Sequence, residues 1–223
     1  MLTIELILPT KNLPIRRVLA KLFQSYIYHC LDNKEHDGYK HTNGKVFKSM
    51  NFKIFYIQNK IDIKFVALDP NNEKILANKI LIEGIKLGEI HITQTTLSLI
   101  ERKKSIKPTI TLGGFISCAI KDGKLSKKKI YLEPKSDKFQ EILRNNTLQK
   151  YEALFNKPYE KELTINFLNQ KPKERLFYYS KGVIKAWYGV FEITADEEML
   201  MMILQTGMGG DCMKGIGFVE IIK

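Results

Sequence analysis

Cysteine is scarce in this chain. Only three occur in 223 residues, Cys30, Cys118 and Cys212, and they lie far apart. An odd, scattered set supplies no disulfide framework, and no pair has the spacing of zinc ligands. The chain also lacks an apolar run of the roughly eighteen residues that cross a bilayer. Its first residues, Met1–Glu5, lack the basic start of a signal peptide. These absences predict a cytoplasmic protein with no membrane partner.

Motifs for metals and cofactors are missing as well. The sequence contains no H-E-x-x-H, no paired cysteine motif and no evident carboxylate cluster. Low-complexity segments and short repeats are equally absent. We therefore predict that the protein uses no metal and no cofactor.

Acidic residues are outnumbered by basic ones. Lys and Arg total 36 against 24 Asp and Glu, which gives a formal charge of +12 and a pI near 9.4. Such an excess attracts a phosphate backbone, with an affinity that falls as salt rises. Many lysine-rich proteins bind no acidic partner, so this evidence is weak by itself. The hydrophobic content of 44% and the length favour one large domain or two small ones.

Glycine is concentrated near the end of the chain. Gly207, Gly209, Gly215 and Gly217 form a G-x-G-x5-G-x-G frame, and we call residues 207–217 the glycine loop. Glycine tolerates positive φ and allows close approach of the backbone, so loop amides beside the cation Lys214 could face a phosphate. The frame lacks the Lys-Ser/Thr of nucleotide hydrolases, and a strand follows it where the dinucleotide fingerprint needs a helix. The alternative is a plain turn between the last helix and the last strand.

Hydrophobic periodicity predicts the order β-α-β-β-α-β in the first half. Its elements are strand 2–8, helix 14–31, strands 47–58 and 61–68, helix 69–83 and strand 88–99, with a polar loop at 33–45. This order is typical of the ferredoxin-like unit.

The second half repeats that order. Its elements are strands 109–121 and 127–132, helix 136–155, strands 162–168 and 182–194 around a basic stretch, helix 196–205 and strand 218–222. Thr194-Ala-Asp-Glu197 reads as a capping box for the last helix. We predict an α+β fold of two tandem ferredoxin-like (RRM-like) modules with antiparallel sheets, residues 1–103 and 108–223. The linker is expected to begin at the charge cluster 102–104.

Two such modules that end in G-x-G-x5-G-x-G-F-V resemble the repeat-associated RNA-binding superfamily of CRISPR systems. More narrowly, the chain is similar to the CRISPR endoribonucleases that cut repeat RNA into guide units. The likeness is carried by residues 24–31, 39–52, 148–158 and the glycine loop. The resemblance implies CRISPR repeat RNA as the partner, with effector-complex subunits as a further partner. It also implies cleavage without metal by a histidine that a tyrosine and a lysine assist.

His41 is the first choice for that histidine. It lies in a polar loop seven residues before Lys48, and the resemblance implies about that interval. His36 in the same loop is the second choice, and the alternative for His41 is a solvated loop histidine. Tyr28 points away from the apolar stripe of its helix, so packing gives no reason for an aromatic there, whereas Tyr26 lies within the stripe. An incidental surface tyrosine is the alternative.

A second basic segment precedes the last long strand. Lys171, Lys173 and Arg175 alternate with other residues before Phe177, Tyr178 and Tyr179. Interleaved cations and aromatics suit phosphate contact plus base stacking, although a basic run can simply be solvated. We predict RNA contacts for these three cations and for the glycine loop.

The predicted reaction is attack by the RNA 2′-oxygen, which leaves a 2′,3′-cyclic phosphate and a 5′-hydroxyl. Histidine suits the proton transfers and lysine can hold the phosphate oxygens. A noncatalytic RNA-binding subunit of a CRISPR effector is the main alternative, because such relatives share the glycine loop. A small-molecule enzyme that binds a phosphorylated ligand is a more distant one.

Overall fold

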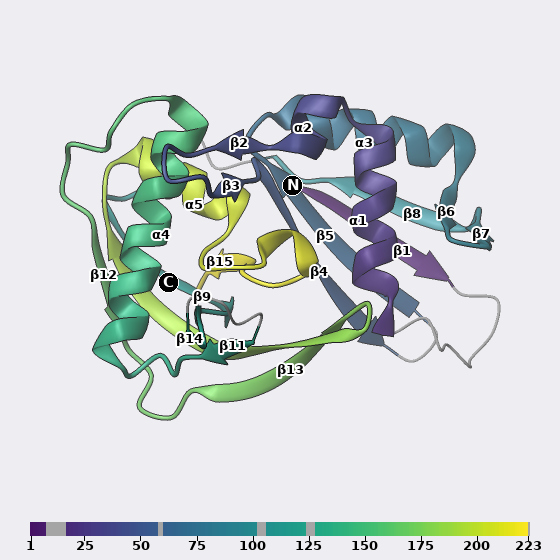
Figure 1. Cartoon of the computed structure of the whole chain (residues 1–223). Coiled ribbons are helices and arrows are strands. Elements are labelled where there is room, and N and C mark those ends of the chain that lie inside the picture. The colour runs from purple at the N-terminus through teal and green to yellow at the C-terminus, as the bar shows by residue number, and fades with distance from the viewer. Residues whose placement is uncertain (8–16, 58–59, 102–105, 124–127, 223) are drawn as a thin grey trace.

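A computed structural model describes residues 1–7, 17–57, 60–101, 106–123 and 128–222 (Figure 1). Two antiparallel sheets, one from each half of the chain, dominate the molecule. Helices lie beside each sheet, and the glycine loop lies between the halves (Figure 1). No helix within the described ranges is long and apolar enough to cross a membrane.

The first half contains one four-stranded sheet in the order β4-β5-β1-β8. Its elements are β1 (Leu2–Ile7), α1 (Leu19–Cys30), α2 (Asn33–Asp37), β2 (Tyr39–Lys40), β3 (Val46–Phe47), β4 (Met50–Ile57), β5 (Lys60–Ala67), α3 (Pro70–Glu83), β6 (Ile85–Leu87), β7 (Ile90–Ile92) and β8 (Thr95–Leu99). Alternate residues of β1 are buried, and the apolar stripe of α1 packs on them. Burial of this stripe and of one strand face produces the predicted β-α-β-β-α-β unit.

The second half repeats the arrangement with the sheet order β12-β14-β9-β15. Its elements are β9 (Thr109–Ile116), β10 (Ala119–Lys121), β11 (Lys129–Tyr131), α4 (Asp137–Phe155), β12 (Thr164–Phe167), β13 (Lys173–Tyr179), β14 (Gly182–Thr194), α5 (Glu197–Thr206), the 3-10 helix η2 (Cys212–Lys214) and β15 (Val219–Ile221). In both sheets the second and fourth strands of the unit are the outer ones. The predicted pair of ferredoxin-like units is therefore confirmed.

Several expectations differ from the structure. The stretch 33–45, expected to be a polar loop, contains α2 and β2, because Asp32 caps α2 by accepting a hydrogen bond from the Glu35 amide. The basic stretch before β14 is itself a strand, β13, paired along β14. The last helix is capped by Asp196, which accepts from the Met199 amide, and not by Thr194, which pairs with Thr109 in the sheet.

Two predicted strands are divided. The segment 109–121 breaks into β9 and β10, and the carbonyl of Ser117 between them accepts a hydrogen bond from the Gly210 amide at 2.8 Å. A backbone group committed to the glycine loop cannot continue the sheet ladder. The segment 88–99 likewise forms β7, which pairs with β6, and β8, which pairs with β1.

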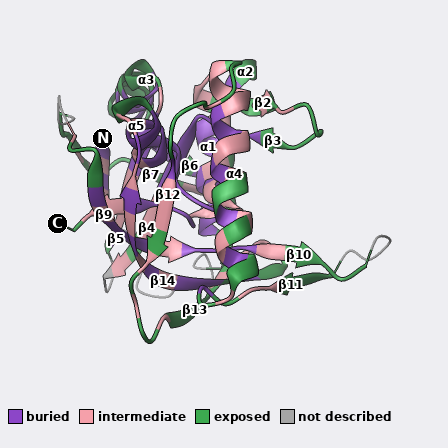
Figure 2. Cartoon of the chain, turned by 90° about the vertical axis from the view of Figure 1, so that its left-hand side faces the viewer, coloured by how far each residue is buried: buried purple, intermediate pink, exposed green. Residues whose placement is uncertain are grey.

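Each half has its own hydrophobic core, coloured as buried in Figure 2. The second half also contributes to the core of the first half, because Met213 of the glycine loop is buried in it and Tyr179 of β13 packs against it. Glu220 of β15 also accepts hydrogen bonds from Lys53 and Lys64 of the first sheet. The glycine loop and β15 are thus anchored on both halves. The proposed linker start at 102–104 lies outside the described residues, so the module boundary stays a prediction.

Candidate functional site

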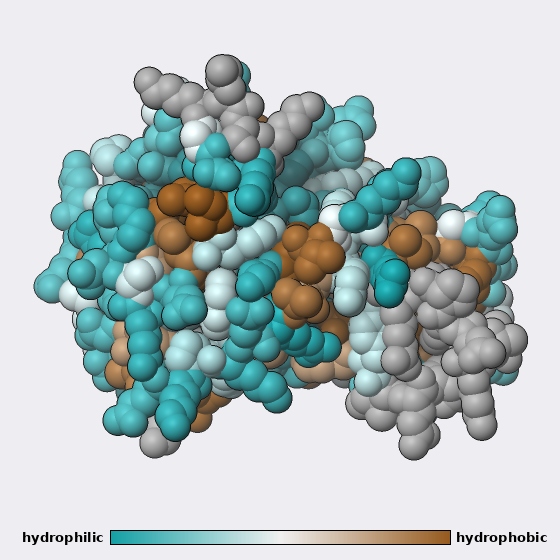
Figure 3. Space-filling model, turned by 60° about the horizontal axis from the view of Figure 1, so that its bottom comes forward, coloured by the Kyte–Doolittle hydropathy of each residue, from teal (hydrophilic) through white to brown (hydrophobic). Residues whose placement is uncertain are grey.

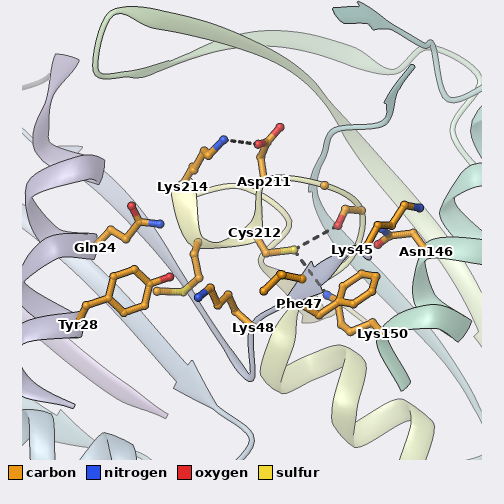
Figure 4. Close-up of a pocket in the computed structure, with 14 residues that line it drawn as sticks. Gln24, Tyr28, Lys45, Phe47, Lys48, Asn146, Lys150, Asp211, Cys212 and Lys214 are labelled. Atoms are coloured by element: carbon orange, nitrogen blue, oxygen red, sulfur yellow. Dashed lines mark hydrogen bonds and ion pairs between the residues drawn. The ribbon is translucent and has the colours of Figure 1, made fainter. Parts of the chain in front are cut away.

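A cavity of about 330 Å³ opens between the two halves (Figure 4). Its wall combines α1, the segment around β3, α4 and the glycine loop. The lining includes Gln24, Tyr28, Lys45, Lys48, Asn146, Lys150, Asp211, Cys212 and Lys214. Sequence segments up to about 190 residues apart therefore meet at one hollow, and four of these side chains are lysines.

Tyr28, Lys48 and His36 form a cluster at one side of this cavity. The Lys48 ammonium lies 5.0 Å from the centroid of the Tyr28 ring. The His36 ring meets the same tyrosine edge-on, with centroids 5.0 Å apart. Lys48 also donates to the carbonyl oxygen of His36. The structure thus brings together two first-choice residues, Tyr28 and Lys48, with the second-choice histidine.

Burial alters the acid–base properties of this cluster. Tyr28 is half-buried, since His36 and Lys48 cover it, and is not the exposed aromatic that the helical pattern predicted. Burial raises the pKa of Tyr28 to about 12, so its hydroxyl stays protonated at neutral pH. The hydroxyl oxygen itself is buried and has no hydrogen-bond partner among the described residues. Burial also lowers the pKa of Lys48, although Asp37 and Glu35 act in the opposite direction.

His41 lies apart from that cluster, in the turn between β2 and β3. Its Nε2 is 2.7 Å from an oxygen of Glu152 on α4, and its Nδ1 accepts a hydrogen bond of 3.1 Å from the Asn43 amide. Only 9% of the His41 side chain is exposed, against 61% for His36. His41, the first-choice histidine, lies in the first half of the chain and is hydrogen-bonded by Glu152 of the second half.

Two lysines of the cavity were missed by the sequence reasoning. Lys150 of α4 is buried and donates to the carbonyl oxygens of Thr206 and Gly207, at 3.2 and 2.7 Å. Lys45 donates to the side-chain oxygen of Gln149 at 2.8 Å. A signal for Lys150 was present, because it lies on the buried face of its helix, between Thr147 and Tyr151. A charged residue at such a position calls for a specific partner.

At least one glycine of the glycine loop is required by contacts within the protein itself. Gly217 has a φ of +76°, and a Cβ there would lie 2.4 Å from the carbonyl oxygen of Met208. Its amide already donates to the carbonyl of Phe115 at 2.8 Å, as the Gly207 amide does to Ile203. A phosphate would have to use other amides of the loop. At Gly215, with a φ of +81°, the nearest atom would be 3.5 Å from an added Cβ. Gly209 also has a positive φ.

The cation of the loop is already paired. Lys214 lies 2.6 Å from Asp211 (Figure 4), and Asp211 also pairs with Lys129 at 3.2 Å. Burial acts to raise the pKa of Asp211, but the two lysines outweigh it, and the pKa lies below its ordinary value of 3.8. The Lys214 ammonium also lies 5.2 Å from the Tyr179 ring centroid. Lys214 is therefore less available to a phosphate than its sequence position suggested.

Of the three predicted basic RNA contacts, Lys173 and Arg175 lie on β13 and Lys171 lies just before it. Arg175 stands over the rings of Phe115 and Phe177, at 5.5 and 5.2 Å from their centroids, beside a second cavity of about 210 Å³. Lys171 and Lys173 are exposed. The bottom face in Figure 3 is largely hydrophilic, with separate apolar patches. The expected interleaving of cations and aromatics is therefore present, and its last aromatic, Tyr179, donates a hydrogen bond to Gln24, which lines the same cavity as Tyr28.

Tandem ferredoxin-like modules with this loop define a class of RNA-binding proteins found in CRISPR systems. Residues 101–221 match the family model described as CRISPR associated protein Cas6, C-terminal. This match covers more than half of the chain, and the chain belongs to that family, whose members are CRISPR-associated proteins that process repeat RNA.

Solved structures support the same fold. A RAMP protein that binds different RNA substrates superposes with a TM-score of 0.75 at 14% identity, over 100% of this chain and 99% of that one. A Cas6-related protein from Pyrococcus furiosus gives 0.72 at 17%, over 100% and 98%. A CRISPR associated protein Cas6 gives 0.67 at 18%, over 100% and 98%. No curated protein matches the chain.

Proposed function

We propose that this protein is an endoribonuclease that cuts CRISPR repeat RNA by attack of the 2′-hydroxyl on the adjacent phosphate. The products are a 2′,3′-cyclic phosphate and a 5′-hydroxyl. The proposal rests on the family and on one observation, which is the charge balance of the cavity between the two halves.

Three lysines at this cavity have only neutral hydrogen-bond partners in the described part of the chain. Lys45 donates to an amide oxygen, whereas Lys48 and Lys150 donate to backbone carbonyls. Lys150 is buried, Lys48 is partly buried and Lys45 is exposed. Cations that are not directly paired with a carboxylate leave a positive potential in the cavity. A phosphate that gains charge in the transition state would supply the missing anion, and the lysines would stabilise it.

The other groups have complementary roles in this proposal. His41 accepts the proton of the 2′-hydroxyl, with His36 as the alternative. Tyr28, which is protonated, donates a hydrogen bond to the phosphate or to the leaving oxygen. Both ring nitrogens of His41 are hydrogen-bonded within the protein. This does not exclude His41 as the base, because catalytic hydrogen bonds often form only once the substrate is bound.

The test uses end-labelled repeat RNA with the purified protein in excess EDTA. We expect a discrete cut whose upstream product carries a cyclic phosphate. A matched RNA with one 2′-deoxynucleotide at the cleavage position should remain intact. Loss of cutting in EDTA, or cutting of the deoxy substrate, would contradict the mechanism.

One observation favours a noncatalytic RNA-binding protein as the second candidate. Both ring nitrogens of His41 are occupied within the protein, which suits a residue that only anchors its turn. Tight binding of repeat RNA with no cut under any condition tested would support that candidate. Association with CRISPR effector subunits stays a prediction, to be tested by co-purification.

A further inference from the structure

Helix α4 reaches two parts of the proposed site at once. We call residues 39–47, which contain β2, the turn and β3, the catalytic hairpin. Glu152 and Gln149 of α4 contact the hairpin residues His41 and Lys45, and Lys150 between them contacts the glycine loop. Figure 2 shows α4 beside the hairpin. The resemblance drew attention to this helix segment but assigned it no role.

The hydrogen bonds of His41 define which tautomer its neutral ring adopts. Nδ1 accepts from the Asn43 amide, so in the neutral ring it carries no proton. Nε2 therefore carries the proton and donates it to the Glu152 carboxylate at 2.7 Å. The nitrogen with the free electron pair is Nδ1, and only the backbone amide of an exposed turn residue occupies it.

We propose that Glu152 is the positioning residue of His41 and that Nδ1 is the atom that takes the proton. This inference rests on the proposed function. The RNA 2′-hydroxyl replaces the Asn43 amide at Nδ1 and gives it a proton, and its electron pair forms the new bond to phosphorus. The bond from phosphorus to the 5′-oxygen breaks, and that oxygen takes a proton from water. The carboxylate of Glu152 stabilises the resulting imidazolium.

The residues of this pair come from opposite halves of the chain. His41 belongs to the first ferredoxin-like unit and Glu152 to the second. The proposed active site is thus complete only when the two halves are docked. The Glu152 side chain is 40% exposed, and its ion-pair partner among the described residues is His41. Glu152 therefore acts chiefly through His41.

A purely structural role would be to anchor the hairpin, and two substitutions separate the roles. Glu152→Gln keeps an acceptor and the anchor but lacks the charge, whereas Glu152→Ala loses both. We expect single-turnover cleavage to fall by about 10- to 100-fold in the Ala variant and less in the Gln variant, a range typical of residues that orient a reactive imidazole. RNA affinity should stay within about twofold.

The decisive measurement is a double-mutant cycle with His41→Ala. If Glu152 acts through His41, Glu152→Ala costs nothing further once His41 is gone. The matched control is Gln149→Ala, which removes the hydrogen bond between Lys45 of the hairpin and the same helix. Its effect on the cleavage rate should be the same in the wild-type and the His41→Ala backgrounds. Equal losses from Glu152→Ala in both backgrounds, or wild-type rates in that variant, would overturn the inference.

A second readout needs no activity. Nitrogen-15 NMR of the His41 ring should show the proton on Nε2 in the wild type, and Glu152→Ala should disturb that pattern while Gln149→Ala leaves it. An unchanged ring spectrum in Glu152→Ala overturns the positioning role. If the wild type cuts no RNA but the spectrum responds as expected, the proposed function fails and the positioning of His41 by Glu152 stands.

Discussion

The buried ammonium group of Lys150 lies 2.7 Å from the carbonyl oxygen of Gly207, the first residue of the glycine loop. It also donates to the carbonyl of Thr206, the last residue of α5. A cation at the carboxyl end of a helix interacts favourably with the unpaired carbonyls there. Lys150 thus holds the loop onto α4 and adds positive charge behind it.

The first prediction concerns this lysine. Lys150→Met keeps the unbranched apolar part of the side chain but leaves two buried carbonyls without their donor. We expect the free energy of unfolding in urea to fall by about 1–3 kcal/mol, and RNA affinity to fall as well. The control is Lys138→Met on the exposed face of the same helix, which should change stability by less than about 0.5 kcal/mol. Equal effects of the two substitutions would show that Lys150 has no special role.

The second prediction concerns the two histidines. His41→Ala should lower the cleavage rate by roughly two to four orders of magnitude with RNA binding near normal. Lys48→Ala and Tyr28→Phe should cost less. Single-turnover rates at saturating protein measure this directly. If His36→Ala abolishes cutting and His41→Ala does not, the cluster of Tyr28, Lys48 and His36 is the catalytic one. Full activity of the double histidine variant would exclude histidine catalysis.

The third prediction concerns the glycine loop. Gly217→Val should lower the melting temperature along with RNA affinity, because its Cβ would clash with the Met208 carbonyl. Gly215 has room for a side chain, and asparagine tolerates positive φ, so Gly215→Asn should stay folded. We expect weaker RNA binding in this variant, with cleavage partly restored at saturating protein. A folded Gly215→Asn protein that binds repeat RNA like the wild type would make the loop a turn only.

The fourth prediction concerns pH. The pKa of Asp211 is below its ordinary value of 3.8 in the folded protein, so its ion pairs stabilise the fold above about that pH. This contribution is lost as the pH falls through the lower folded-state value. Asp211→Asn should therefore be less stable than the wild type at neutral pH, and the difference should shrink in acid. Urea melts at several pH values check this.

The same variant tests the charge of the loop. Asp211→Asn releases Lys214 and Lys129 from their shared carboxylate. The slope of log affinity against log salt concentration should then become steeper by about one released ion. An unchanged slope would place both lysines outside the RNA contact.

Much of the secondary structure could be predicted from hydrophobic periodicity and from local sequence signals. The alternation of β1 and the proline and aspartate at the start of α3 predicted those elements closely, since each depends on local residue order. The short helix α2 and the strand β13 were missed. A five-residue helix has too few turns to show a stripe, and β13 begins with three charged residues and continues with a run of apolar and aromatic ones, so it shows no apolar alternation.

By itself, the sequence determined the residue types of the site, the repeated β-α-β-β-α-β order and the glycine loop, because these follow from composition and short-range spacing. Only the tertiary structure decided which residues meet. The order of residues contains no sign that Glu152 contacts His41, 111 positions away, or that Lys150 supports Gly207. Those contacts arise because the burial of two separate hydrophobic cores docks α4 against the hairpin and the loop.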